Sequence, residues 1–123
     1  MDKISFGKRG EEKAARYLQS QGYKILEMNF KAKRYGEIDI VALDPSAGSG
    51  QVVLVFVEVK TRKTYEYGRP EESFTPRKLR LVARTGQYYM LMNPNSPKQV
   101  RVDAVAVDEV ENKITLFKNV TQM

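Results

Sequence analysis

Two carboxylates and a lysine interrupt stretches of the chain that are otherwise apolar. Asp39 lies within the segment 38–42, whose other members are apolar, and Glu58 and Lys60 follow the apolar run 52–57. An unpaired charge near a hydrophobic core is costly, so these side chains need a cation, mutual pairing or solvent. Two neighbouring carboxylates repel each other, and a bound Mg²⁺ removes that penalty. The residue types therefore indicate a site for a hard divalent cation.

The absence of histidine and cysteine excludes several classes of chemistry. Neither type occurs among the 123 residues, which rules out disulfides, thiolate or imidazole metal sites, and Ser-His or Cys-His catalysis. The formal net charge is +6, from 21 Lys and Arg against 15 Asp and Glu. This excess favours a polyanionic partner, nucleic acid first, although simple solubility would account for it equally well.

Asp39 and Glu58 are expected to lie on neighbouring antiparallel strands, because residues 44–50 between them have the composition of a turn. Opposed residues in such a pair share a face, and their residue numbers have a constant sum. A sum of 97 would place Asp39 opposite Glu58, with Cβ atoms about 5 Å apart, so that one cation could lie between them. The same register would place Glu37 opposite Lys60, whereas an even sum would divide the set between the two faces.

Asp39, Glu58 and Lys60 could instead be explained without a cation, because Lys60 could form ordinary cross-strand ion pairs with Glu37 and Glu58. A third carboxylate, Glu11, helps to choose between these two interpretations. It belongs to a helical stripe formed by Gly7, Glu11, Ala14, Ala15 and Leu18. This stripe should pack on the sheet, so Glu11 would point toward two carboxylates, an arrangement that calls for a cation. The alternative is that Glu11 is a helix-start carboxylate stabilised by the macrodipole.

The whole chain predicts elements in the order helix, three strands, helix, two strands. The expected helices span 7–21 and 76–92, and the expected strands span 23–30, 37–43, 51–60, 100–107 and 113–118. Thr75 followed by Pro76 suits an N-cap and a first helical residue. The buried stripe of the second helix is expected to comprise Leu79, Val82, Ala83, Gly86 and Met90. This pattern indicates an α/β fold of the α+β sandwich type, with helices packed on a mixed sheet.

The length suits one domain over residues 1–123. No stretch approaches the roughly 20 apolar residues of a membrane helix. Residues 1–10 lack the apolar core of a secretory signal. We therefore expect a cytoplasmic protein with no membrane partner.

Basic residues in three stretches near the acidic segments are candidates for binding nucleic acid. They are Lys31, Lys33 and Arg34; Arg62 and Lys63; and Arg77, Lys78, Arg80 and Arg84. Arg77 and Lys78 oppose the macrodipole at a helix start, which either phosphate contact or chance surface charge would explain. Tyr65 and Tyr67 add rings suited to base stacking, although a solvated loop would look similar. We expect backbone-dependent, salt-sensitive binding.

These segments resemble a known nuclease pattern. Asp39, the run Glu58-Val59-Lys60 and Glu11 on a preceding helix resemble the PD-(D/E)XK superfamily, and within it the arrangement is similar to archaeal Holliday-junction resolvases. More closely, the blocks 7–11, 36–42, 56–62 and 101–107 resemble the bacterial YraN family. The resemblance covers roughly residues 7–118. It implies a restriction-endonuclease-like core, a mixed sheet flanked by helices.

The resemblance further implies a metal-dependent DNA endonuclease, structure-selective in the manner of a junction resolvase, that acts in DNA repair or recombination. Asp39, Glu58 and the main-chain carbonyl of Val59 would hold Mg²⁺ or Mn²⁺, and Glu11 would join directly or through a water. Lys60 would orient the attacking water and stabilise the transition state.

Two alternatives remain open: a catalytically silent nucleic-acid-binding module that retains the fold, and a protein-interaction scaffold whose basic surface meets an acidic partner. As substrate we expect DNA in preference to RNA. Action on a symmetric junction would call for a homodimer.

Overall fold

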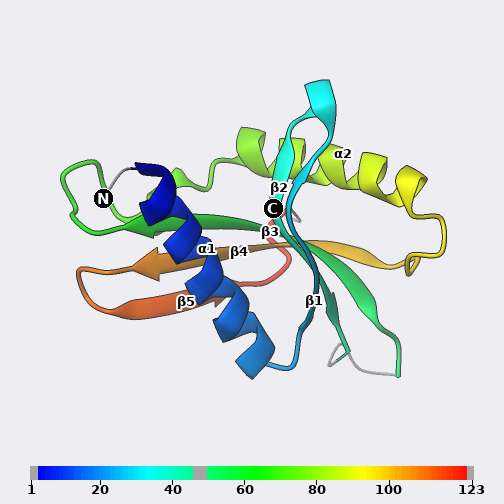
Figure 1. Cartoon of the computed structure of the whole chain (residues 1–123), viewed down its shortest axis with the longest axis horizontal. Coiled ribbons are helices and arrows are strands. Elements are labelled where there is room, and N and C mark those ends of the chain that lie inside the picture. Colours follow the sequence, from blue (N-terminus) through cyan, green and yellow to red (C-terminus); the bar gives the residue numbers. More distant parts are fainter. Residues whose placement is uncertain (1–2, 46–49, 122–123) are drawn as a thin grey trace.

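The computed structural model describes residues 3–45 and 50–121. Its elements are α1 (Lys3–Ser20), β1 (Lys24–Lys31), the 3₁₀ helix η1 (Lys33–Tyr35), β2 (Glu37–Asp44), β3 (Val53–Arg62), the 3₁₀ helix η2 (Pro70–Ser73), α2 (Pro76–Met92), β4 (Val100–Asp108) and β5 (Lys113–Phe117). The predicted order of helices and strands is confirmed (Figure 1). Within the predicted turn 44–50, positions 46–49 lie outside the described residues.

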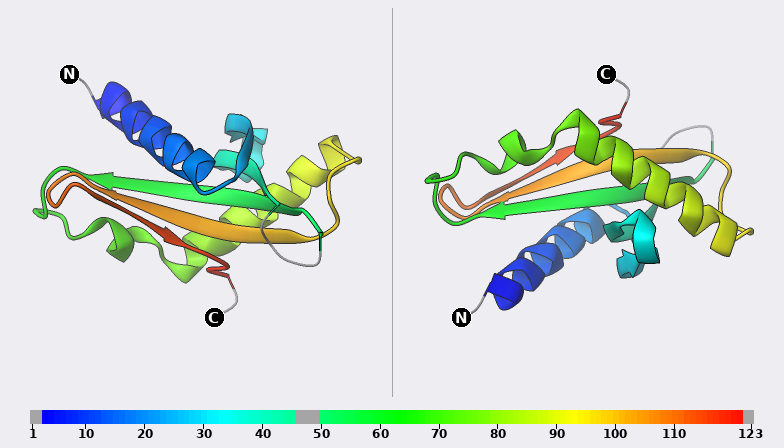
Figure 2. Two further views of the ribbon diagram at one scale, coloured as in Figure 1. Left: turned by 90° about the horizontal axis from the view of Figure 1, so that it is seen from below. Right: turned by 90° about the horizontal axis from the view of Figure 1, so that it is seen from above.

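The five strands form one mixed sheet in the order β1-β2-β3-β4-β5. All neighbours are antiparallel except β3 and β4, which are parallel. The parallel pair requires a crossover connection, and α2 supplies it. Helices α1 and α2 cover opposite faces of the sheet (Figure 2). The result is the α+β sandwich that the sequence predicts.

Strand β3 is the middle strand of the sheet, and helices cover both of its faces, so its residues 53–59 are buried. Its odd-numbered valines pack with Ala14 and Leu18 of α1, whereas Leu54 and Phe56 pack with Leu79 and Val82 of α2. Side chains alternate along a strand, so Glu58 and Lys60 share the face that α2 covers. The fold therefore places the acidic end of β3 within reach of α2.

Two glycines allow the helices to approach β3 closely. A Cβ at Gly86 of α2 would lie 2.3 Å from a ring carbon of Phe56, and a Cβ at Gly10 of α1 would lie 2.0 Å from the Thr61 hydroxyl oxygen. Both distances are far below van der Waals contact. Larger side chains would therefore push each helix away from the end of β3 that carries Glu58 and Lys60.

The buried stripe of α2 differs in part from the predicted one. Leu79, Val82 and Gly86 are buried as expected, but Thr85 and Tyr89 are buried as well, and Ala83 and Met90 are only half-buried. The Thr85 hydroxyl lies 2.8 Å from the carbonyl oxygen of Leu81, and Tyr89 packs edge-on against Phe56. A buried hydroxyl is tolerated because it is hydrogen-bonded.

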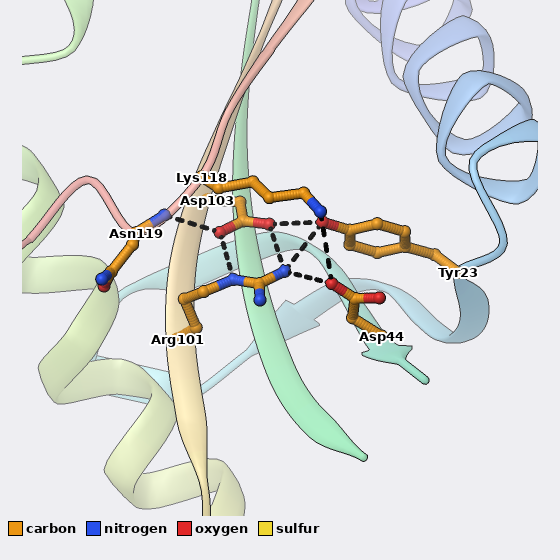
Figure 3. Close-up of polar contacts among 6 residues, drawn as sticks. All are labelled: Tyr23, Asp44, Arg101, Asp103, Lys118 and Asn119. Carbon is orange, nitrogen blue, oxygen red and sulfur yellow. Dashed lines mark hydrogen bonds and ion pairs between the residues drawn. The ribbon is translucent and has the colours of Figure 1, made fainter. Parts of the chain in front are cut away.

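A polar cluster ties the sheet together at the end of β2 remote from Asp39. The Arg101 guanidinium donates hydrogen bonds to Asp44 at 2.6 Å and to Asp103 at 2.8 Å. Tyr23, just before β1, donates its hydroxyl to Asp103 at 2.8 Å. Figure 3 shows these groups converging, with the backbone N–H of Asn119 completing the shell of Asp103. The cluster joins the start of β1, the end of β2, β4 and the segment after β5.

Candidate active site

The strands β2 and β3 pair in the predicted register. The pairs run from Ile40 with Val57 to Asp44 with Val53, and each pair sums to 97. The ladder ends at Ile40, so the predicted pairing of Asp39 with Glu58 and that of Glu37 with Lys60 both lie outside it. Beyond that point the two strands diverge (Figure 1).

Asp39 lies where the ladder ends. Beyond that point its carboxylate, and not a backbone carbonyl of β2, bonds to the backbone of β3. One carboxylate oxygen accepts a hydrogen bond from the backbone N–H of Val59 at 2.8 Å. Burial raises the pKa of Asp39, and its carboxyl group is close enough to that of Glu58 for the charge of Glu58 to raise this pKa as well. The two acids therefore approach each other in the opening between the strands.

Glu11 reaches the same opening from α1, on the other side of the sheet. Its polar neighbours are the side chains of Asp39 and of Asn29 in β1. Its Oε1 atom is buried and has no hydrogen-bond partner among the described residues. Burial raises the pKa of Glu11, although these two neighbours both act to lower it. A buried oxygen without a donor is a feature that a bound cation would satisfy.

The environment of Asp39 is unusual for a carboxyl group. Burial, followed by the negative charge of Glu58, raises the pKa of Asp39 to about 8. An aspartate in water titrates near 3.9. Without a cation, the three-acid group of Glu11, Asp39 and Glu58 therefore retains a proton at neutral pH.

Two lysines face these acids. Lys78 of α2 places its Nζ 3.0 Å from Oε2 of Glu58, whose side chain is only 6% exposed. Lys60 adjoins Lys78, and burial together with the charge of Lys78 lowers the pKa of Lys60. Burial also acts to lower the pKa of Lys78, but the hydrogen bond and charge of Glu58 outweigh it, and the pKa is raised.

A cavity of about 940 Å³ opens over these residues. The three acids, Val59 and both lysines line it, together with Glu37 and Gly36 at the start of β2. Phe6 and Tyr67 add aromatic surface to the lining. Its volume falls in the range typical of ligand sites.

The predicted basic residues divide into two groups. Arg62, Lys63 and Lys78 line the cavity. The remaining six are exposed outside its lining: Lys31, Lys33, Arg34, Arg77, Arg80 and Arg84. Arg62 is partly committed to the fold, since its Nη2 donates to the Ser73 hydroxyl at 2.8 Å. Lys63 packs over the Phe6 ring at 5.2 Å.

Sequence reasoning missed two contributors to the site. Asn29, which binds Glu11, has a positive φ of 57° within β1, and asparagine tolerates this conformation better than most residues. Lys78 was predicted only as a phosphate ligand, and its ion pair with Glu58 was not anticipated. The signal available for Lys78 was a cation at the start of a helix, where the macrodipole disfavours it.

The fold and the site together define an α+β domain with acids, lysines and a cavity at the open end of a β-hairpin, an arrangement consistent with a nuclease-like domain. The chain belongs to the family described as "Uncharacterised protein family UPF0102", whose model matches residues 10–107. This is the YraN family that the sequence blocks resemble.

Relatives of similar length occur in several bacteria. The chain is 44% identical over 113 residues to a UPF0102 protein of Persephonella marina, covering 92% of this chain and 90% of the relative. It is 38% identical over 123 residues to a UPF0102 protein of Caldicellulosiruptor saccharolyticus, covering 97% and 98%. None of the helices within residues 3–45 and 50–121 is long and apolar enough to cross a membrane.

Proposed function

We propose that this chain is a metal-dependent DNA endonuclease that acts on branched or otherwise irregular DNA in repair or recombination. The observation that carries the proposal is the meeting of Glu11, Asp39 and Glu58 beside Lys60 in one cavity. Structural ion pairs alone do not account for this group, because the acids outnumber their cations and one oxygen of Glu11 has no donor among the described residues. Perturbed titratable groups in a cavity are typical of functional sites.

The donor set fits Mg²⁺ or Mn²⁺ in its chemistry. Asp39, Glu58 and Glu11 with the main-chain carbonyl of Val59 offer only oxygen ligands, which hard divalent cations prefer. In the part of the chain that the structure describes, no three acidic side chains are already arranged around one point as ligands. Glu58 is instead held by Lys78. When bound, the ion would supply charge neutralisation at the scissile phosphate and an activated water.

The chain's own groups have separate roles in this proposal. Lys60 holds the attacking water and stabilises charge that develops on the phosphate, a role that its place in the cavity lining beside the acids allows. The exposed cations of α2 and of the β1–β2 connection bind the sugar–phosphate backbone, so affinity should fall steeply with salt. We propose DNA as the substrate in preference to RNA, and a homodimer where the substrate is a symmetric junction.

A cleavage panel of junction, flap, single-stranded and duplex DNA tests the activity. With Mg²⁺ or Mn²⁺ we expect Asp39→Ala and Lys60→Ala to lower the cleavage rate by about a hundredfold or more, because each removes a group that acts on the reacting phosphate. Glu12, the exposed neighbour of Glu11, is the matched control, and Glu12→Ala should cleave as fast as wild type. Equal activity in all variants would point to a contaminating nuclease and defeat the proposal.

The alternative function, a silent DNA-binding module, predicts a different result. Such a module would bind DNA in a salt-dependent way but would show no cleavage and no loss of Mn²⁺ binding in Asp39→Ala. An enzyme should bind Mn²⁺ and lose that binding in the variant. Salt-dependent DNA binding by gel shift would in turn count against a scaffold for an acidic protein partner.

Tyr67 is expected to bind an unpaired base at the edge of the cavity. Its side chain is 81% exposed and lines the cavity. The neighbouring Tyr65 is less available, because it donates its hydroxyl to Asp108 and packs beneath the Arg69 guanidinium at 4.5 Å. Stacking of one base contributes about 1–3 kcal/mol, so Tyr67→Ala should weaken binding of flap DNA about fivefold or more.

Fluorescence anisotropy with labelled flap DNA, and Ca²⁺ in place of Mg²⁺, measures this effect without cleavage. Tyr67→Phe retains the ring and should bind as wild type does. Affinity that is unchanged in Tyr67→Ala would remove Tyr67 from the interface.

A further inference from the structure

Lys78 occupies a helix position where a lysine is normally unfavourable. Thr75 is the N-cap of α2, and its hydroxyl accepts a hydrogen bond from the backbone N–H of Lys78 at 3.2 Å. Lys78 is therefore the third helical residue, a position that favours an acid or amide, and the macrodipole opposes a cation there. The ion pair of Lys78 with Glu58 compensates for this cost.

The two partners of this ion pair differ in their freedom to move. The Glu58 side chain is 6% exposed, whereas that of Lys78 is 44% exposed. Glu58 belongs to the central strand and cannot leave the core, and removing its counter-charge would be strongly unfavourable. Lys78 has a long, flexible stem and can carry its ammonium to water. Lys78 is thus the exchangeable partner of a fixed acid.

We propose that Lys78 is a resident counter-cation of Glu58, that a divalent cation displaces it, and that its ammonium then binds a phosphate of the nucleic acid. This inference rests on the proposed function, because both require the carboxylates to hold a cation. A divalent ion at Glu58 and an ammonium 3.0 Å from the same oxygen would repel each other strongly at that distance. Lys78 lines the cavity, so the displaced ammonium stays in the space that a phosphate would enter.

The charges of the site agree with such an exchange. Glu11, Asp39 and Glu58 face Lys60 and Lys78 in the cavity lining, so the acids outnumber these two lysines. A divalent cation held by these acids adds positive charge at the base of the cavity, where a phosphodiester would lie. Cation binding and nucleic-acid binding are therefore coupled through Lys78, and by linkage each strengthens the other.

Titration of Mn²⁺ and of DNA against Lys78→Met tests the exchange. Removing the competing ammonium should raise Mn²⁺ affinity about fivefold or more, the size of an ordinary coupling between sites. Arg80→Met removes an exposed cation two residues along the same helix and should change Mn²⁺ affinity by less than about twofold, as expected for a screened surface charge. Lys78→Arg keeps a cation beside Glu58 and should remain close to wild type.

The DNA titration gives a second and independent readout. In wild type, saturating Ca²⁺ should strengthen binding of labelled flap DNA, and in Lys78→Met this gain should shrink because the released ammonium is absent. Thermal unfolding of each variant with EDTA shows whether the protein is folded before titration, and Lys78→Gln replaces Lys78→Met if the latter does not fold.

The outcomes separate this inference from the proposed function. If wild type binds Mn²⁺ and Lys78→Met binds it no more tightly than Arg80→Met does, the proposed displacement of Lys78 is wrong. The proposed metal site is then still supported. If neither wild type nor Lys78→Met binds Mn²⁺, the proposed metal-dependent function is wrong and the exchange falls with it.

Discussion

Replacing Asp39 with asparagine is expected to stabilise the metal-free protein while it abolishes Mn²⁺ binding and cleavage. Burial, then the charge of Glu58, raises the pKa of Asp39 to about 8, so the folded state resists ionisation of this group. Asparagine has the same shape and its Oδ1 can still accept the hydrogen bond from Val59 N–H. We expect the free energy of unfolding to rise by roughly 2–4 kcal/mol at about pH 8, since each pKa unit corresponds to about 1.4 kcal/mol.

The direction of the pH dependence follows from proton binding. Above about pH 4 the unfolded chain has lost the proton of Asp39, whereas the folded protein keeps it up to about pH 8. The folded state then binds more protons, so its free energy of unfolding falls as the pH rises through this window. Asp39→Asn lacks this group and should show a shallower decline.

Urea unfolding with EDTA at about pH 5 and about pH 8 measures the difference. The gain from Asp39→Asn should be small at the lower pH and largest at the higher one. Glu12→Gln removes an exposed acid and should shift neither value by more than about 0.5 kcal/mol. Added Mg²⁺ should stabilise wild type at about pH 8 and leave Asp39→Asn unchanged. A variant no more stable than wild type at about pH 8 would show that Asp39 is not a destabilising acid.

Asp39 and Glu58 could be brought together from the sequence because their positions depend on local rules. Alternation fixes the face of each residue in a strand, and the turn-like stretch between the strands restricts the register. The observed sum of 97 in the β2–β3 ladder confirms this reasoning. The order of helices and strands follows in the same way from periodicity and from the Thr75-Pro76 helix start.

The contacts of Lys78 and Asn29 could not be predicted because they depend on how distant elements approach one another. Lys78 meets Glu58 only because α2 crosses above β3, and the close approach of α2 depends on Gly86 fitting against Phe56. Asn29 reaches Glu11 across the gap between α1 and β1. The periodicity of the sequence predicts neither the contact of Lys78 with Glu58 nor that of Asn29 with Glu11. The burial of Thr85 and Tyr89 has the same origin, since Thr85 also lies against the carbonyl oxygen of Tyr35 and Tyr89 packs against Phe56.

Arg101→Met is expected to lower the free energy of unfolding by about 3–5 kcal/mol, the usual cost of leaving buried charges without their partner. The Arg101 guanidinium binds Asp44 and Asp103, and both acids are fully buried. The Arg101 side chain is itself only 14% exposed, so water cannot readily replace it. Chemical denaturation measures the loss.

The matched control for this cluster is Lys118, whose Nζ lies 3.6 Å from Asp44 but whose side chain is 49% exposed. Lys118→Met should cost less than about 1 kcal/mol, because an exposed ion pair contributes little. Adding Asp44→Asn and Asp103→Asn to Arg101→Met should recover part of the stability, since the buried charges that have lost the guanidinium are then removed. A loss in Arg101→Met no larger than that in Lys118→Met would contradict the role of this cluster. Because the cluster lies at the end of β2 remote from Asp39, the folded fraction of Arg101→Met should bind Mn²⁺ as wild type does, which separates stability from the metal site.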